Sequence, residues 1–148
     1  EIVKFVEKNF RTLANKKNRA IAGLSMGSFH SCNISKYYPD MFDYVGLFSG
    51  ASTGNDKSTC PVYTDFEGKL KTQFAKKPAL YFIACGKTDF VYKGVADFRK
   101  LLDDNGYKYE YLETDEGTYL EELANLSDGV RAEVVQIRGF GITNLITK

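Results

Sequence analysis

Residues 19–30, RAIAGLSMGSFH, hold the pattern that decides the fold. Small and aliphatic side chains over residues 19–24 predict a short buried strand, and residues 29–38 predict a helix that ends before a proline. Between them, residues 23–27 match the pattern G-x-S-x-G. A serine at the centre of this pattern, on a tight turn between a strand and a helix, holds its hydroxyl away from the backbone. This context predicts that Ser25 is a nucleophile.

The turn around Ser25 suits acyl-transfer chemistry. Its flanking glycines leave room for a sharp corner. The N-terminus of the following helix points toward the negative charge that develops during nucleophilic attack. The alternative is a glycine-rich turn in which the serine only caps the helix. The strand–turn–helix context favours the nucleophile.

The rest of the chain alternates between strands and helices. The strongest strand pattern is residues 78–85, a nearly continuous apolar run that is followed by a glycine. Further strands are predicted over residues 44–49 and 107–113, and helices over residues 2–13, 29–38, 66–76 and 95–102. Alternating elements of this kind form βαβ crossovers. We therefore expect an α/β fold with a mainly parallel sheet and helices on both of its faces.

The composition is that of one folded domain or a part of one. The 148 residues are 43% hydrophobic and 26% charged, and 11 phenylalanines and 10 tyrosines argue against a disordered chain. The formal net charge of +1 provides no strong field for nucleic acid or an anionic membrane. No apolar run approaches the ~20 residues of a membrane span. We therefore expect neither a nucleic-acid partner nor a membrane partner.

The sequence predicts no metal and no other cofactor. The three cysteines, Cys32, Cys60 and Cys85, are widely spaced and form no C-x-x-C pair. With one histidine in the chain they make a poor zinc set. Cys85 ends an apolar run and is interpreted as a buried thiol.

A serine nucleophile needs a base, and the base needs an acid behind it. In a sheet of this kind the acid follows a later strand, and Asp89 lies three residues beyond Gly86. The alternative for Asp89 is a turn or capping aspartate. The one histidine, His30, precedes Asp89 and lies in the helix after Ser25, which turns it roughly 140° away from the elbow. We expect His30 to pack or to form a hydrogen bond under the sheet rather than to act as the base.

The sequence resembles carbohydrate esterase family one, the α/β-hydrolases related to feruloyl, acetyl-xylan and enterochelin-type esterases. The resemblance is carried by RAIAGLSMGSFHS…YPDMFDYVGLFSGA and KPALYFIACGKTDFVYKGVADFRKLLDDNGYKYEYLET, and it covers about residues 1–116. It implies that Ser25 is the nucleophile, Asp89 the acid of the triad, and the backbone N–H of Met26 one oxyanion donor. It also implies a secreted or periplasmic protein, although this chain shows no signal peptide. Ser28 is a mild departure, because the family more often has glycine there.

Two parts of the family pattern are missing from this sequence. The family's first strands, with the loop that supplies the second oxyanion N–H, are expected to precede Glu1. Residues 1–117 are therefore interpreted as the C-terminal part of an α/β-hydrolase domain. The family also carries Gly-Gly-His-x-Trp after the strand at residues 107–112, where this sequence continues differently. The catalytic histidine is thus absent from this chain.

Residues 118–148 are interpreted as an atypical, frameshifted tail. Codons for residues 118–138 can be chosen so that removal of their first base yields His-Ile-Trp-Arg-Asn-Trp, a helical apolar pattern and a stop. A suitable codon for Gly117 places a glycine before that histidine, as in the family. The alternative is a genuine divergent C-terminus.

The resemblance leads to two functions of different classes. The first is a serine carboxylester hydrolase that deacylates feruloylated or acetylated polysaccharide, or cleaves a similar small ester, through Ser25, Asp89 and a histidine. The alternative is a catalytically inactive fragment or non-enzymatic binding module that keeps the fold and lacks the base. Acyl transferases and peptidases share the elbow and the acid, and they rank third.

Overall fold

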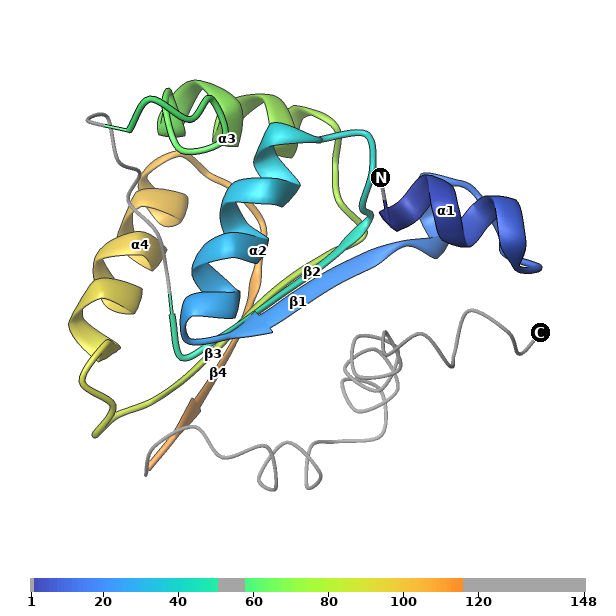
Figure 1. Cartoon of the computed structure of the whole chain (residues 1–148). Coiled ribbons are helices and arrows are strands. Elements are labelled where there is room, and N and C mark those ends of the chain that lie inside the picture. Colours follow the sequence, from blue (N-terminus) through green and yellow to red (C-terminus); the bar gives the residue numbers. More distant parts are fainter. Residues whose placement is uncertain (1, 51–57, 116–148) are drawn as a thin grey trace.

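Four parallel strands form the centre of the structure, a computed structural model that describes residues 2–50 and 58–115. The strands follow one another across the sheet in the order β1-β2-β3-β4. The expected α/β fold with a parallel sheet is confirmed (Figure 1). The elements are α1 (Ile2–Asn9), a 3₁₀ turn (Lys16–Asn18), β1 (Ala20–Leu24), α2 (Met26–Tyr37), β2 (Tyr44–Phe48), α3 (Phe66–Ala75), β3 (Leu80–Gly86), α4 (Tyr92–Asp104) and β4 (Glu110–Thr114).

The register of the strands brings their carboxyl ends together. Leu24 pairs with Phe48, and Phe48 pairs with Ala84 of β3. Farther along, Gly86 pairs with Thr114 of β4. Because all four strands run in the same direction, the residues that follow them lie along one edge of the sheet, where parallel α/β sheets carry their sites.

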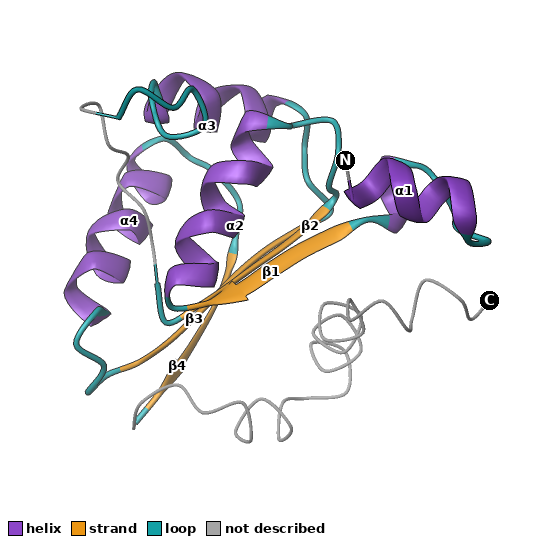
Figure 2. Ribbon diagram, in the orientation of Figure 1, coloured by secondary structure: helices purple, strands orange, loops and turns teal. Residues whose placement is uncertain are grey.

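The helices α2, α3 and α4 pack on the same face of the sheet (Figure 2). Every second residue of β2 and β3 contributes to this contact, as the two-residue period of a strand requires. The helices supply Cys32 from α2, Phe66 and Leu70 from α3, and aliphatic and aromatic residues from α4. The shared buried cluster consists of Cys32, Val45, Leu47, Phe66, Leu70, Tyr81, Ile83, Cys85, Val95, Phe98 and Leu102.

The opposite face of the sheet is apolar as well. Its buried residues are Ala20, Phe48, Leu80, Phe82 and Ala84. Apolar side chains on both faces explain why β3 reads as a nearly continuous hydrophobic run, since a strand that is buried on both sides lacks polar alternation. Each of the seven residues of β3 is buried, which confirms the strongest strand prediction.

The last strand begins later than predicted. Residues 107–109 precede β4, because the chain is still leaving α4 through Gly106, whose φ is 66°. The N–H of Tyr107 donates to the carbonyl of Leu102 at 2.9 Å, and the ring of Tyr107 stacks on that of Phe74 at 4.4 Å. These contacts hold Tyr107 against α3 and α4, so the prediction of a strand from residue 107 was wrong by three residues.

The first helix also differs from its prediction. It ends at Asn9, so Phe10 and Leu13, which were predicted on its apolar face, lie beyond it and are 46% and 56% exposed. No residue of α1 is buried. A charged contact joins α1 to the chain before β1: Arg19 Nε donates to Glu7 Oε1 at 2.9 Å.

The structure also bears on membrane-spanning segments, metal ligands and the cysteines. Within residues 2–50 and 58–115, no helix is both long and apolar enough to cross a membrane. The same residues contain no group of three His, Cys, Asp or Glu side chains that could hold a metal ion. Cys85 is a buried free thiol, as predicted. The tail at residues 118–148 lies outside the described residues, and its interpretation stays a prediction.

Candidate active site

Ser25 lies at the corner between β1 and α2 in a strained backbone conformation. Its φ and ψ are 55° and −117°, a region that residues other than glycine rarely adopt. The Ser25 N–H donates to Phe48 O at 2.9 Å, and the Ser25 carbonyl accepts the N–H of Phe29 at 3.1 Å. The predicted strand–helix corner with a strained serine is confirmed. The side chain is exposed and does not cap α2, which argues against the capping alternative.

The two glycines of the G-x-S-x-G pattern have different roles. A Cβ on Gly23 would lie 2.1 Å from the carbonyl carbon and oxygen of Gly27, so any side chain there would push α2 away from β1. A Cβ on Gly27 would meet nothing within 4 Å. Gly23 is therefore the glycine on which the corner depends.

The start of α2 is tied to the chain after β2. Ser28 is fully buried, and its hydroxyl donates to the carbonyl of Gly50 at 2.6 Å. A Cβ on Gly50 would lie 2.8 Å from Ser25 O, so the backbone at Gly50 packs directly on the elbow. Ser28, which stands where the resembled family more often has glycine, thus has its own hydrogen-bond partner in Gly50.

The backbone N–H of Met26 is the predicted oxyanion donor. Met26 is the first residue of α2, where N–H groups have no partner within the helix. The positive end of the helix dipole reinforces any negative charge that is held there. The side chain of Met26 is 65% exposed, so it does not enclose the site.

Asp89 forms a turn just after β3. Its N–H donates to Gly86 O at 3.1 Å, and its Oδ1 accepts the N–H of Val91 at 3.0 Å. Its carbonyl accepts the N–H of Tyr92, the first residue of α4, at 2.9 Å. Asp89 therefore stabilises this turn, which is the role that the alternative interpretation gave it. The turn engages Oδ1, and Oδ2 can accept a hydrogen bond from another donor.

Ser25 and Asp89 follow β1 and β3 at the same, carboxyl edge of the sheet. One strand, β2, lies between them. Because neighbouring strands are about 4.8 Å apart, β1 and β3 are separated by roughly 10 Å. This spacing matches the expected gap, which is wide enough for an imidazole ring. The catalytic roles of the two residues stay predictions.

His30 is held away from this gap. It lies on α2 with an exposed side chain, and its Nδ1 is 3.1 Å from the hydroxyl of Tyr63. Its ring also contacts Phe29, with 5.6 Å between centroids. The expected hydrogen bond is present, whereas the expected place under the sheet was wrong, since the ring lies at the surface against Tyr63.

The thiol next to the aspartate turn is not a competing nucleophile. Burial, together with the nearby carboxylates of Asp89 and Glu113, raises the pKa of Cys85 to about 11. A protonated thiol is a poor nucleophile. Glu113 itself accepts the hydroxyls of Tyr92 at 2.8 Å and Tyr111 at 3.1 Å. The hydrogen bond from Tyr92 is the main cause that lowers the pKa of Glu113.

Sequence reasoning missed Glu113, although it connects the candidate site to β4. Its partner Tyr92 directly begins the helix that follows the Asp89 turn. Glu113 also lies 3.7 Å from Lys87, which pairs with Asp115 at 2.7 Å. Its place in an alternating strand gave no local signal for this role, because Tyr92 and Lys87 come from other parts of the chain.

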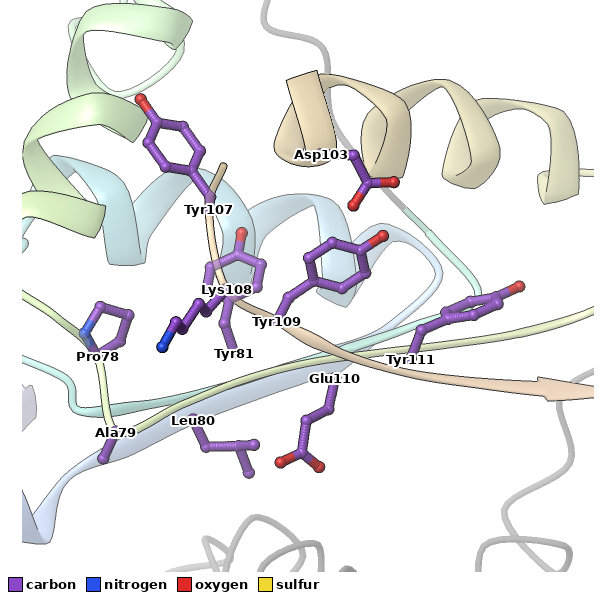
Figure 3. A pocket seen from close by; sticks show the side chains of 10 residues that line it. All are labelled: Pro78, Ala79, Leu80, Tyr81, Asp103, Tyr107, Lys108, Tyr109, Glu110 and Tyr111. Atoms are coloured by element: carbon purple, nitrogen blue, oxygen red, sulfur yellow. The ribbon is translucent and has the colours of Figure 1, made fainter. Parts of the chain in front are cut away.

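A cavity of about 670 Å³ lies at the other edge of the sheet (Figure 3). It is bounded by the amino ends of β3 and β4 and by the end of α4. Figure 3 shows the rings of Tyr107, Tyr109 and Tyr111 on the side of β4 where the helices lie, with Leu80 and Glu110 on the other side. This cavity is separate from the edge that carries Ser25 and Asp89.

Comparisons with known protein sequences match the chain to an esterase family. The sequence model of the family Esterase, described as "Putative esterase", matches residues 1–82. An endo-1,4-beta-xylanase/feruloyl esterase of Xylanibacter ruminicola is 35% identical over 123 residues, which are 83% of this chain and 15% of that protein.

Solved structures support the fold alone, because their sequence identities are low. A ferulic acid esterase matches with a TM-score of 0.65 and 22% identity, over 99% of this chain and 58% of its own. The S-formylglutathione hydrolase FrmB of Staphylococcus aureus gives 0.65 and 21%, over 92% and 57%. A CE1 ferulic acid esterase of Anaeromyces mucronatus gives 0.63 and 18%, over 96% and 50%. The chain thus spans between half and three fifths of these solved structures.

Proposed function

This chain belongs to the Esterase family, and from that premise we propose that it is part of a serine carboxylester hydrolase in which Ser25 is the nucleophile. The observation that carries the proposal is the conformation of Ser25. Its strained backbone places the side chain at the start of a helix and at the carboxyl edge of a parallel sheet. The side chain is exposed, and its hydroxyl makes no capping hydrogen bond to the helix. Backbone strain of this kind is retained where function requires it.

In the proposed reaction, Ser25 Oγ attacks the ester carbonyl while a base removes its proton. The oxyanion receives a hydrogen bond from the N–H of Met26 and is stabilised by the helix dipole. Loss of the alcohol leaves an acyl-serine, which water then hydrolyses with the same base. Asp89 orients the base through Oδ2, because its Oδ1 is engaged by the N–H of Val91.

The base in this proposal is a histidine other than His30. The sequence contains one histidine, and its ring is hydrogen-bonded to Tyr63 on the surface of α2. A frameshift near Gly117 would supply the missing histidine in another frame. Sequencing the DNA that encodes residues 114–120 tests this part, and a frame without His-x-Trp codons would refute it.

The proposed substrate is an acylated carbohydrate, such as a feruloylated or acetylated polysaccharide, or a small ester of the same acids. The relative with 35% identity is named an endo-1,4-beta-xylanase/feruloyl esterase, which supports this class. In the second candidate function the chain is catalytically inactive and only keeps the hydrolase fold. The placement of His30 away from Ser25 favours that alternative.

Hydrolysis of 4-nitrophenyl acetate and methyl ferulate by the 148-residue chain separates the two functions. We expect turnover that depends on Ser25 but is far slower than that of a complete triad, because no base removes the proton of the serine hydroxyl. Asp89→Asn should change this residual rate little while the base is absent. Identical rates for the parent and Ser25→Ala would support the inactive alternative, and rapid Ser25-dependent turnover would reassign the base to His30.

A further inference from the structure

The cavity at the amino edge of the sheet, the tyrosine cavity, is lined on one side by Tyr107, Tyr109 and Tyr111 (Figure 3). The three residues stand at every second position, and each is half-buried. β4 is the last strand of the described sheet, so the cavity lies at an outer border of the molecule's sheet. Its volume of about 670 Å³ falls within the range of about 300–1,000 Å³ that is typical of ligand pockets.

Neighbouring helices hold the three rings in fixed orientations. The ring of Tyr107 stacks on Phe74 of α3, with 4.4 Å between centroids and an interplanar angle of 1°. Arg99 of α4 holds the other two, because its Nε donates to the Tyr109 hydroxyl at 3.3 Å and its guanidinium lies 3.5 Å from the centroid of the Tyr111 ring. Rings that are already fixed lose little conformational entropy when a ligand packs against them.

Polar side chains of the cavity are available to a ligand. Asp103, Lys108 and Glu110 line it and are exposed. Within residues 2–50 and 58–115, these three side chains form no hydrogen bond or ion pair, and the hydroxyl of Tyr107 forms no hydrogen bond. Two carboxylates and one ammonium group nearly balance in charge, so the lining attracts neither anions nor cations strongly.

We propose that the tyrosine cavity binds a neutral carbohydrate chain. A pyranose ring has an apolar C–H face that packs on a tyrosine ring, and hydroxyls that donate to the carboxylates of Asp103 and Glu110. An anion would meet these carboxylates, and a cation would meet Lys108 and the guanidinium that already covers Tyr111. The choice of a xylan chain as the carbohydrate rests on the proposed function.

The tyrosine cavity is too far from Ser25 to hold the ester that is cleaved. The seven residues of β3 run from one edge of the sheet to the other, and at about 3.3 Å per residue they separate the two edges by roughly 20 Å. A polysaccharide bound at the amino edge would be tethered to the protein while another part of the same chain reaches the carboxyl edge. Such a tether raises the effective concentration of the substrate.

Titration of the full 148-residue chain with xylohexaose, a soluble xylan fragment, tests the site through ¹H–¹⁵N spectra. We expect saturable shifts in the amide signals of residues 103–111. Tyr109→Ala should weaken this binding about fivefold, because it removes one stacking ring. Tyr109→Phe keeps the ring and should bind within about twofold of the parent, since it loses at most one hydroxyl contact.

A second variant serves if Tyr109→Ala fails to fold. Asp103→Ala changes an exposed side chain and should weaken binding about threefold, because a carboxylate acceptor is lost. Asp97→Ala is its matched control, since Asp97 is exposed on the same helix and does not line the cavity. No saturable shifts in residues 103–111, or equal affinities for the parent, Tyr109→Ala and Asp103→Ala, would overturn the proposal. Self-association of the chain through these residues without sugar would also overturn it, because a second copy would then occupy the edge.

Cleavage of methyl ferulate by the same proteins distinguishes this site from the proposed function. Binding that depends on Tyr109, without cleavage that depends on Ser25, would refute the hydrolase and keep the tyrosine cavity as a carbohydrate site. Cleavage that depends on Ser25, without xylohexaose binding at residues 103–111, would keep the hydrolase and refute the carbohydrate site.

Discussion

Lys36 is a buried cation that forms no ion pair with a carboxylate among the described residues, and we predict that Lys36→Met stabilises the protein. The side chain lies on α2 and is 1% exposed. Its Nζ donates to Asn33 Oδ1 and lies 4.4 Å from the centroid of the Phe66 ring on α3. Burial of a charge is unfavourable when no opposite charge compensates for it.

The size of the effect follows from the pKa of Lys36. This pKa is lowered from 10.5 to about 8, mainly by burial and also by Lys69, whereas Cys32 and Asp65 act in the opposite direction. At 1.36 kcal/mol per pH unit, this difference corresponds to about 3 kcal/mol at pH 7. The substitution also removes the ring contact and the hydrogen bond, each about 1 kcal/mol. We therefore expect a net gain of about 1 kcal/mol at pH 7.

The sign of the pH dependence is fixed by the same values. Between pH 8 and 10.5 the unfolded chain holds a proton on Lys36 that the folded chain has released, so parent stability rises with pH in this window. Methionine does not titrate. The advantage of Lys36→Met should therefore shrink above pH 8 and reverse before pH 10.

Urea denaturation of the parent and Lys36→Met at pH 7, 8.5 and 10 measures this change. Lys71→Met is the matched control, because Lys71 lies on the same helix as Phe66 and is exposed. The control should change the free energy of unfolding by less than about 0.5 kcal/mol at each pH. A Lys36→Met variant that is less stable at pH 7, or whose difference from the parent is the same at pH 7 and 10, would refute the reasoning.

Three further predictions concern the packing of the elbow, and urea denaturation measures each of them. Gly23→Ala should lose about 3 kcal/mol or fail to fold, because its Cβ would lie 2.1 Å from the Gly27 carbonyl; wild-type stability would show that α2 can move. Gly27→Ala should gain about 0.5–1 kcal/mol, because it has free space in a helix; a loss above 1 kcal/mol would contradict this. Ser28→Ala should lose about 1–2 kcal/mol, because the Gly50 carbonyl loses its buried donor; an unchanged midpoint would show that the 2.6 Å hydrogen bond contributes nothing.

The sequence by itself predicted the elements whose signal is local. A tight strand–helix turn depends on small residues within five positions, so Gly23, Ser25 and Gly27 identified the corner and its strain. The apolar run at β3 predicted a strand buried on both faces. Alternation of the elements then predicted a parallel sheet, and a parallel sheet places Ser25 and Asp89 at one edge.

The tertiary structure decided the features that depend on contacts between distant segments. Only the approach of α2 to β1 shows that Gly23 is required and Gly27 is not. Tyr63 holds His30 at the surface from 33 positions away, and Arg99 of α4 holds the rings of Tyr109 and Tyr111. No local pattern encodes the tyrosine cavity, because it forms only where the ends of β3, β4 and α4 meet.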